Sequence, residues 1–258
     1  MIEVVLQQWA AWAPGLSTRE AWAHWSASPA PLTSQEVADA SFLPAMLRRR
    51  CTPLSRAMLA AAYGCAPAAD LSAVRTVFAS RHGSINESVP LFHNIAHGER
   101  MSPSRFTHTV HNAQSGLFSI AAGNRMASSA MSARAETFAC GFLEAATHLH
   151  RDPSVPVLLV VGDVALSDTF APLIQEPDAA YAVALLLAAA GEGTPLQFDV
   201  EGSAEMPAPG VPVAESDATA RGWPDAAEMV RWLHGREREL VLRGNGRRWR
   251  WQRGRPGA

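Results

Sequence analysis

The stretch FTHTVHNAQSGLFSIAAGNRMASSAMSARAETFACGFLEAATHLHRDPSVPVLLVVGD, residues 106–163, decides the fold. From Ala113 it has the small and apolar residues of a tightly packed helix, and residues 128–133 predict a short strand. Residues 136–150 carry apolar side chains at helical spacing, namely Phe138, Phe142, Leu143, Ala146 and Leu149. Residues 155–161 are a continuous apolar run, which is typical of a strand covered on both faces. The order helix, strand, helix, strand predicts a layered α/β fold.

The flanking sequence continues this alternation of strands and helices. Thr18 is a good N-cap for a helix over 19–26, and the residues Asn245-Gly246 are a hairpin signal. Strands are predicted over 2–9, 74–79, 179–189 and 196–200, and helices over 53–66, 89–97 and 225–234. No repeat or boundary divides the chain, so we expect a single domain over 1–258.

Composition excludes several classes of function. The 258 residues are 48 % hydrophobic with a formal net charge of -2, which gives no general reason for a nucleic-acid or membrane partner. The longest apolar run, residues 179–190, is shorter than the ~20 residues of a membrane span. The N-terminus lacks the positive start of a signal peptide. Three cysteines without a C-x-x-C pair predict neither a disulfide framework nor a zinc site, and they favour the cytoplasm.

Several short motifs carry a resemblance to a known family. Four segments resemble, in their order and spacing, the core of β-ketoacyl synthases of thiolase-like fold. They are His111-Asn112-Ala113, the strand entering a turn at residues 130–133, the helix from Glu136 and the strand at 157–161. The motifs SRHG, VHNAQSGLFSI and ETFACGFLEA are similar to short ketosynthase-like proteins of bacterial aryl polyene clusters, the xanthomonadin type. The resemblance runs from about Trp22 to Trp251. It is strongest over 22–200, and it implies the N-terminal half of a ketosynthase. A loop over 201–222 and a short C-terminal helix and Arg-rich hairpin over 223–258 then follow.

The same resemblance implies that the catalytic centre is absent. A ketosynthase needs a cysteine thiolate at a helix N-terminus, and two further groups, usually His, that polarise the thioester. The resemblance aligns Ala135 with this nucleophile, and an Ala methyl group forms no thioester. No His lies between His150 and His234. In an alternative register Cys140 is the nucleophile. Ala135 lies 27 residues before Gly162, whereas Cys140 lies 22 residues before Gly162. The longer spacing accommodates a helix of about four turns and favours Ala135.

Four residues near the turn are candidates for a residual pocket: His111, Asn112, Ser115 and Glu136. Glu136 also suits a helix N-terminus electrostatically. Asp163 follows a predicted strand, where α/β proteins place functional groups, although a plain turn residue explains it equally well. No metal-ligand spacing and no phosphate-binding Gly motif is present, so we expect no metal and no cofactor. Phosphopantetheine on an acyl carrier protein is the one ligand that the resemblance implies.

The C-terminal stretch from 243 to 255 contains six Arg and no acidic residue, with Trp249 and Trp251 interleaved. Arg247, Arg248 and Arg250 are therefore candidates for contact with a polyanion or with an acidic acyl carrier protein. The same charges would also protect a solvated edge hairpin from aggregation, and we favour this structural interpretation.

Three hypotheses for the function remain. The first is a non-catalytic partner, similar to a chain length factor, that pairs with a ketosynthase subunit or with itself through the strand near 128–133. The second is a 3-oxoacyl synthase or acyltransferase that acts through Cys140. The third is a module that binds carrier protein or a polyanion through the Arg-rich hairpin.

Overall fold

The computed structural model describes residues 1–258 except 33–35, 66–70, 175–176, 203–216 and 255–258. Within these residues one sheet has the strand order β3-β2-β4-β5-β1-β6-β8-β7. The strands are β1 (Ile2–Trp12), β2 (Arg75–Ala79), β3 (Ser128–Met131), β4 (Val157–Asp163), β5 (Tyr181–Ala188), β6 (Thr194–Gly202), β7 (Glu239–Gly244) and β8 (Arg247–Arg253). Strands β2, β3 and β4 are parallel, whereas the remaining pairs are antiparallel.

The helices are α1 (Arg19–Ala27), α2 (Ala45–Arg48), α3 (Pro53–Gly64), α4 (Ile85–Ala96), α5 (Pro103–Phe106), α6 (Ala113–Ala122), α7 (Thr137–Arg151), α8 (Asp217–Arg221) and α9 (Asp225–His234). One core joins one face of the sheet to α1, α7 and α9. A second core joins the other face to α2, α3 and α6. All residues of β4 and β5 are buried, because helices cover the middle of the sheet on both faces. The predicted layered α/β fold is confirmed.

Local sequence explains why the main elements start where they do. Thr18 caps α1 by accepting a hydrogen bond from the backbone N–H of Ala21 at 3.1 Å. Thr52 caps α3 in the same way, and Pro53 stands at the first helical position, where it costs no hydrogen bond. The apolar face expected of α7 is buried, and its largest members are Phe138, Phe142 and Leu149.

The predicted C-terminal hairpin is confirmed as β7 and β8. Asn245 and Gly246 have φ values of 48° and 74°, the left-handed conformation that a two-residue turn of this kind requires. The turn aligns Leu240 with Trp251 and Leu242 with Trp249. All four side chains are buried against α7 and α9, so the hairpin extends the sheet and its core.

Several helical segments differ from the prediction, and the short helices α2 and α5 were not predicted at all. Helix α4 begins at Ile85, about one turn before the predicted start near residue 89. Pro90 lies inside it, and a Pro there suggested a later start because it has no N–H to donate. Most of the predicted loop over 201–222 lies outside the described residues, but its end forms α8.

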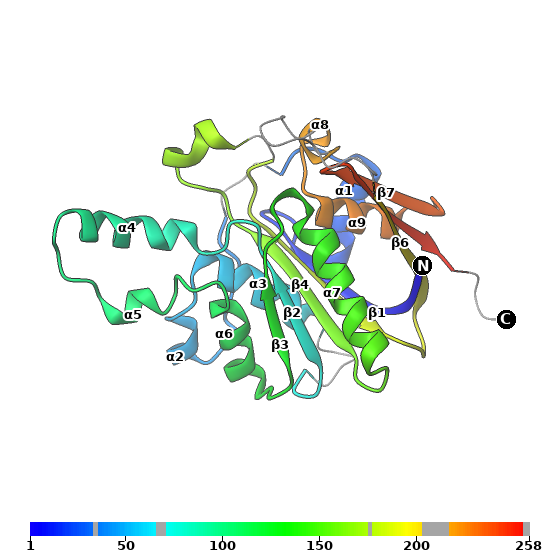
Figure 1. The fold of residues 1–258 in the computed structure, drawn as a ribbon, viewed down its shortest axis with the longest axis horizontal. Coiled ribbons are helices and arrows are strands. Elements are labelled where there is room, and N and C mark those ends of the chain that lie inside the picture. The colour runs from blue at the N-terminus through cyan, green and yellow to red at the C-terminus, as the bar shows by residue number, and fades with distance from the viewer. Residues whose placement is uncertain (33–35, 66–70, 175–176, 203–216, 255–258) are drawn as a thin grey trace.

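Figure 1 shows α4 and α5 extending as an arm from the side of the molecule that carries α6, opposite the hairpin. None of the helices in the described part of the chain has the length and apolar character needed to cross a bilayer.

Candidate functional site

The turn between β3 and α7 is where the resemblance predicted a nucleophile. Arg134 has φ 54°, a left-handed conformation that is uncommon for a residue with a Cβ. A 3-10 turn over Arg134–Glu136 then leads into α7. The Thr137 hydroxyl fixes this geometry, because it accepts a hydrogen bond from Ala133 N–H at 3.0 Å and donates one to the Arg134 carbonyl at 2.7 Å. The sharp strand-to-helix turn is thus present, and Ala135 occupies its middle.

Glu136 follows Ala135 directly, and its side chain is only 5 % exposed. Its carboxylate accepts three hydrogen bonds from the C-terminal hairpin: from Trp249 Nε1 at 2.8 Å, Arg247 at 2.8 Å and Asn245 at 3.0 Å. The backbone of the hairpin is equally close, since a Cβ on Gly244 would lie 3.4 Å from Glu136 Cγ. The helix N-terminus favours a negative charge. Here that charge is supplied by a side chain that anchors the hairpin.

The cavity beside the turn is small. It has a volume of about 50 Å³, and its lining includes Arg134, Ala135, Thr137, Asp163 and Tyr181. Sites for small organic ligands usually enclose roughly 300–1,000 Å³. Within the described residues, the space next to Ala135 is therefore too small for an acyl chain.

Asp163 closes this cavity from the end of β4. Its buried carboxylate accepts hydrogen bonds from Ser80 Oγ at 2.7 Å, from the backbone N–H of His82 at 3.0 Å and of Arg81 at 3.2 Å, and from the Tyr181 hydroxyl at 3.3 Å. The ends of β2, β4 and β5 are tied together in this way. Asp163 is saturated with structural contacts, which favours the turn-residue interpretation.

The charged and polar groups around Asp163 have shifted pKa values. Burial lowers the pKa of the Arg81 guanidinium and of the His82 imidazole, and Asp163 opposes both shifts. Burial raises the pKa of Tyr181 well above its usual value, and Asp163 adds to that shift. The sequence prediction did not include Arg81, His82 or Tyr181. Their places at the ends of strands were the available signal.

Cys140, the alternative nucleophile, lies about one turn inside α7 and is half-buried beside the first core. Burial raises the pKa of its thiol, and the nearby Glu136 raises it further. A nucleophilic cysteine needs a lowered pKa, because the thiolate is the reactive form. The environment of Cys140 therefore suits a structural thiol.

The four residues predicted to line a residual pocket do not converge. Glu136 contacts the C-terminal hairpin, whereas His111 lies against the turn before α4, where a Cβ on Gly83 would be 2.9 Å from His111 Nδ1. Ser115 is buried and donates to the Asn112 carbonyl at 3.0 Å, so these two residues shape the start of α6. A binding role for these four residues stays a prediction.

The three predicted basic contacts have acidic partners. Arg247 pairs with Glu136 at 2.8 Å, and Arg250 pairs with Asp199 at 2.9 Å and with Glu201 at 3.2 Å. Arg248 lies 3.9 Å from Glu201. Strand β6 supplies Asp199 and Glu201 directly opposite β8. This pairing neutralises the surface and favours the structural interpretation of the hairpin over polyanion binding.

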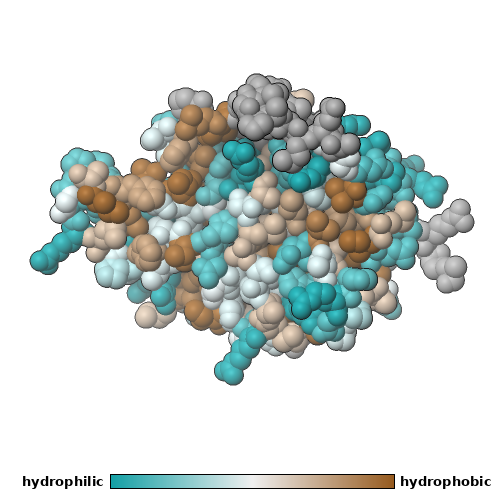
Figure 2. All heavy atoms as spheres, in the orientation of Figure 1, coloured by the Kyte–Doolittle hydropathy of each residue, from teal (hydrophilic) through white to brown (hydrophobic). Residues whose placement is uncertain are grey.

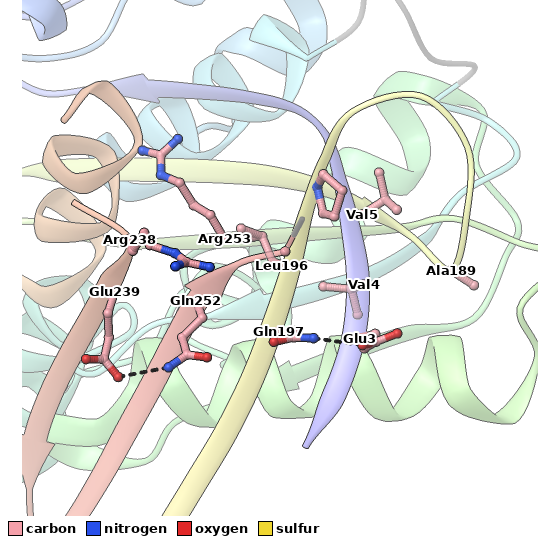
Figure 3. A pocket seen from close by; sticks show the side chains of 12 residues that line it. Glu3, Val4, Val5, Ala189, Leu196, Gln197, Arg238, Glu239, Gln252 and Arg253 are labelled. Atoms are coloured by element: carbon pink, nitrogen blue, oxygen red, sulfur yellow. Dashed lines mark hydrogen bonds between the residues drawn. The ribbon is translucent and has the colours of Figure 1, made fainter. Parts of the chain in front are cut away.

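A larger cavity of about 800 Å³ lies where β1, β6, β8 and β7 run side by side, away from the β3–α7 turn. Figure 3 shows its polar wall, in which Gln197 donates to Glu3 at 2.9 Å and Gln252 donates to Glu239 at 3.2 Å. These groups satisfy one another. Elsewhere in the described residues, no three His, Cys, Asp or Glu side chains gather as metal ligands would.

Comparisons with known proteins identify a family and a similar solved structure for this chain. A family model described as β-ketoacyl synthase, N-terminal domain, matches residues 22–252. Among solved structures, the chain is similar to one described as a ketosynthase (ApeO) in complex with its chain length factor (ApeC) from Xenorhabdus doucetiae. The identity is 27 %, the TM-score is 0.82, and the match covers 98 % of this chain and 100 % of that one. No curated protein sequence matches the chain.

Two more distant structures share the fold. The ishigamide ketosynthase/chain length factor has 14 % identity and a TM-score of 0.60 over 78 % of this chain and 68 % of that one. A type II polyketide acyl carrier protein in complex with its ketosynthase bound to the hexaketide has 16 % identity and a TM-score of 0.62, over 78 % and 70 %. The match to the Xenorhabdus structure thus spans nearly all of this chain and all of the chain matched there. The two more distant matches leave about a third of the other protein's chain uncovered.

Proposed function

Because the chain belongs to the β-ketoacyl synthase N-terminal domain family, we propose that it is the non-catalytic partner of a ketosynthase. It would act as chain length factors do, in a fatty-acid or polyketide-type pathway of the aryl polyene kind. The pair would form a heterodimer that receives acyl groups on the phosphopantetheine of an acyl carrier protein. The acyl thioester would form on the ketosynthase subunit.

The observation that carries this proposal is the arrangement at Ala135 and Glu136. The sharp strand-to-helix turn is present, and the residue that the resemblance aligns with the nucleophile, Ala135, carries only a methyl group. The next residue uses its carboxylate to hold the C-terminal hairpin through three hydrogen bonds. A scaffold that preserves the turn and fills its surroundings with structural contacts is suited to support a partner's chemistry.

The edge of the sheet supports a partner role. Among the residues that the structure describes, β3 pairs with β2 alone and lies at the end of the sheet. Ala127 and Met131 direct their carbonyls at β2, accepting from Thr76 and Ser80. By the alternation of a strand, Ser128 and Ala130 direct their backbone N–H and C=O groups away from β2. An unprotected edge of this kind is a template for a strand of another chain.

The comparison that covers both chains from end to end adds support. The Xenorhabdus structure is described as a ketosynthase with its chain length factor, and one of its chains has the same extent as this one. The carrier-protein complex among the more distant structures suggests the third component by analogy. The enzyme hypothesis finds less support, since the pKa of Cys140 is raised rather than lowered.

The test is titration of the purified chain into the ketosynthase of its pathway, followed by sedimentation velocity. We expect a one-to-one complex with a Kd of about 1 µM or below, as specific interfaces of standard size reach. Ala130→Pro removes the outward N–H and should abolish the complex, whereas Ala130→Ser keeps that N–H and should retain it. If the wild-type chain forms no complex at micromolar concentration, the proposal is wrong.

A further inference from the structure

The arm, defined as residues 85–110, gathers exposed apolar side chains. Of thirteen large apolar side chains that are exposed among the described residues, five belong to this tenth of the chain: Phe92, Ile95, Met101, Phe106 and Val110. Phe92 is 61 % exposed and Phe106 is 52 % exposed. Figure 2 shows brown and tan apolar residues among polar ones on the projecting left end of the molecule, where Figure 1 places α4 and α5.

Little of the arm is used to stabilise the chain itself. Leu91 is the single buried side chain of α4, and α5 has none. Helix α4 packs against α5, and the two Phe side chains remain in solvent. Scattered single apolar residues on a surface need no explanation, but a group of this size on one projecting element indicates an interaction site.

The charges of the arm help to identify the occupant. Glu87 and Glu99 balance Arg100 and Arg105, so the arm has no net formal charge with His neutral. A surface that binds membranes or polyanions carries an excess of Lys or Arg. A neutral group of aromatic and aliphatic side chains instead suits the apolar centre of a protein–protein interface.

The size of the β3 edge argues for the same occupant. Strand β3 offers four residues, whereas a stable interface of standard size uses roughly 20–30 residues on each side. The additional surface must come from elements that flank β3. Ile120 on α6 and Met126 just before β3 are also exposed, and both belong to the segment of chain that connects the arm to this edge.

We propose that the arm is a second contact with the ketosynthase subunit, in which Phe92 and Phe106 are buried as apolar anchors. This inference rests on the proposed function, because the occupant is the same subunit that pairs with β3. The arm extends the interface beyond the strand, and its contact is apolar. Binding through the arm is therefore insensitive to salt.

The experiment compares the affinity of arm variants for the ketosynthase. We expect Phe92→Ala/Phe106→Ala to weaken the Kd about thirtyfold or more, since truncating aromatic anchors accounts for much of the affinity at an interface. Val110→Ala and Val200→Ala form a matched pair, because these side chains are 37 % and 38 % exposed. Val110→Ala should weaken binding a few-fold, whereas Val200→Ala, on β6, should leave the Kd unchanged.

The outcomes separate the two proposals. A wild-type chain that binds while the double Phe variant binds within about threefold of it overturns the role of the arm and leaves the β3 pairing intact. A wild-type chain that does not bind overturns the proposed function and the role of the arm with it. If the double variant instead dissociates a homodimer of the chain alone, the occupant is a second copy and the inference is wrong. Equal melting temperatures for all variants show that each one folds.

Discussion

Glu136→Ala is the perturbation that most directly examines how the β3–α7 turn is held. The substitution removes the acceptor of three hydrogen bonds. Trp249 is buried, so its indole N–H loses its partner at a cost of about 1–3 kcal/mol. Asn245 and Arg247 reach solvent, and the loss of the hydrogen bonds that they donate to Glu136 should add about 1 kcal/mol. We therefore expect the free energy of unfolding to fall by about 2–4 kcal/mol.

For a chain of this size each kcal/mol lowers the melting temperature by about 2–4 °C, so the expected drop is about 4–16 °C. Differential scanning calorimetry measures it, and hydrogen exchange should show faster exchange in β7 and β8. Glu144→Ala is the control on the same helix: Glu144 is 40 % exposed, and its contacts with His148 and with the Ser129 hydroxyl lie near the surface, so the drop should stay within about 2–4 °C. If Glu136→Ala melts no lower than Glu144→Ala, the carboxylate does not hold the hairpin and the reasoning fails.

Three further predictions concern single side chains. Cys140 should react with iodoacetamide more slowly than a free cysteine at neutral pH, because its raised pKa leaves less thiolate. Burial raises the pKa of Cys65 to about 12, so Cys65 should react only in denaturant. Fast labelling of either cysteine in the folded chain would contradict this prediction. Arg253→Ala should lower the free energy of unfolding, measured in urea, by about 1–3 kcal/mol, because the Arg253 guanidinium donates to the carbonyls that end α9. Arg238→Ala, at a neighbouring exposed position, should change that free energy by less than about 0.5 kcal/mol. Hydrogen bonds from Ser154 and Arg75 lower the pKa of Asp152 to about 2. The contribution of Asp152 to the stability of the fold is therefore present above its unfolded pKa of 3.8 and is lost as the pH falls to 2. Asp152→Asn should make the melting temperature depend less on pH over that window, and an unchanged dependence would contradict the assignment.

The regular elements could be predicted because their signals are local. The apolar spacing of residues 136–150 predicted α7, and Asn245-Gly246 predicted the turn between β7 and β8. Each signal lies within one element, so one sequence was enough to locate it.

The site could be predicted only in part, because its contacts join distant segments. The sequence placed Glu136 at a helix N-terminus, but its partners are more than a hundred residues away on a hairpin whose docking no periodicity encodes. The basic stretch left polyanion binding open beside the favoured structural interpretation, and only the strand register shows that Arg250 lies opposite Asp199. The left-handed conformation of Arg134 also depends on its surroundings, since no Gly or Asn marks it.

The central claim is that acyl chemistry takes place on the partner and not on this chain. Intact-protein mass spectrometry tests it after the chain and its ketosynthase are incubated together with an acyl-loaded carrier protein, with Cys140→Ser run in parallel. The account predicts a thioester adduct on the ketosynthase subunit and none on either form of this chain. An adduct on the wild-type chain that disappears in Cys140→Ser would contradict it and identify the chain as an enzyme that acts through Cys140.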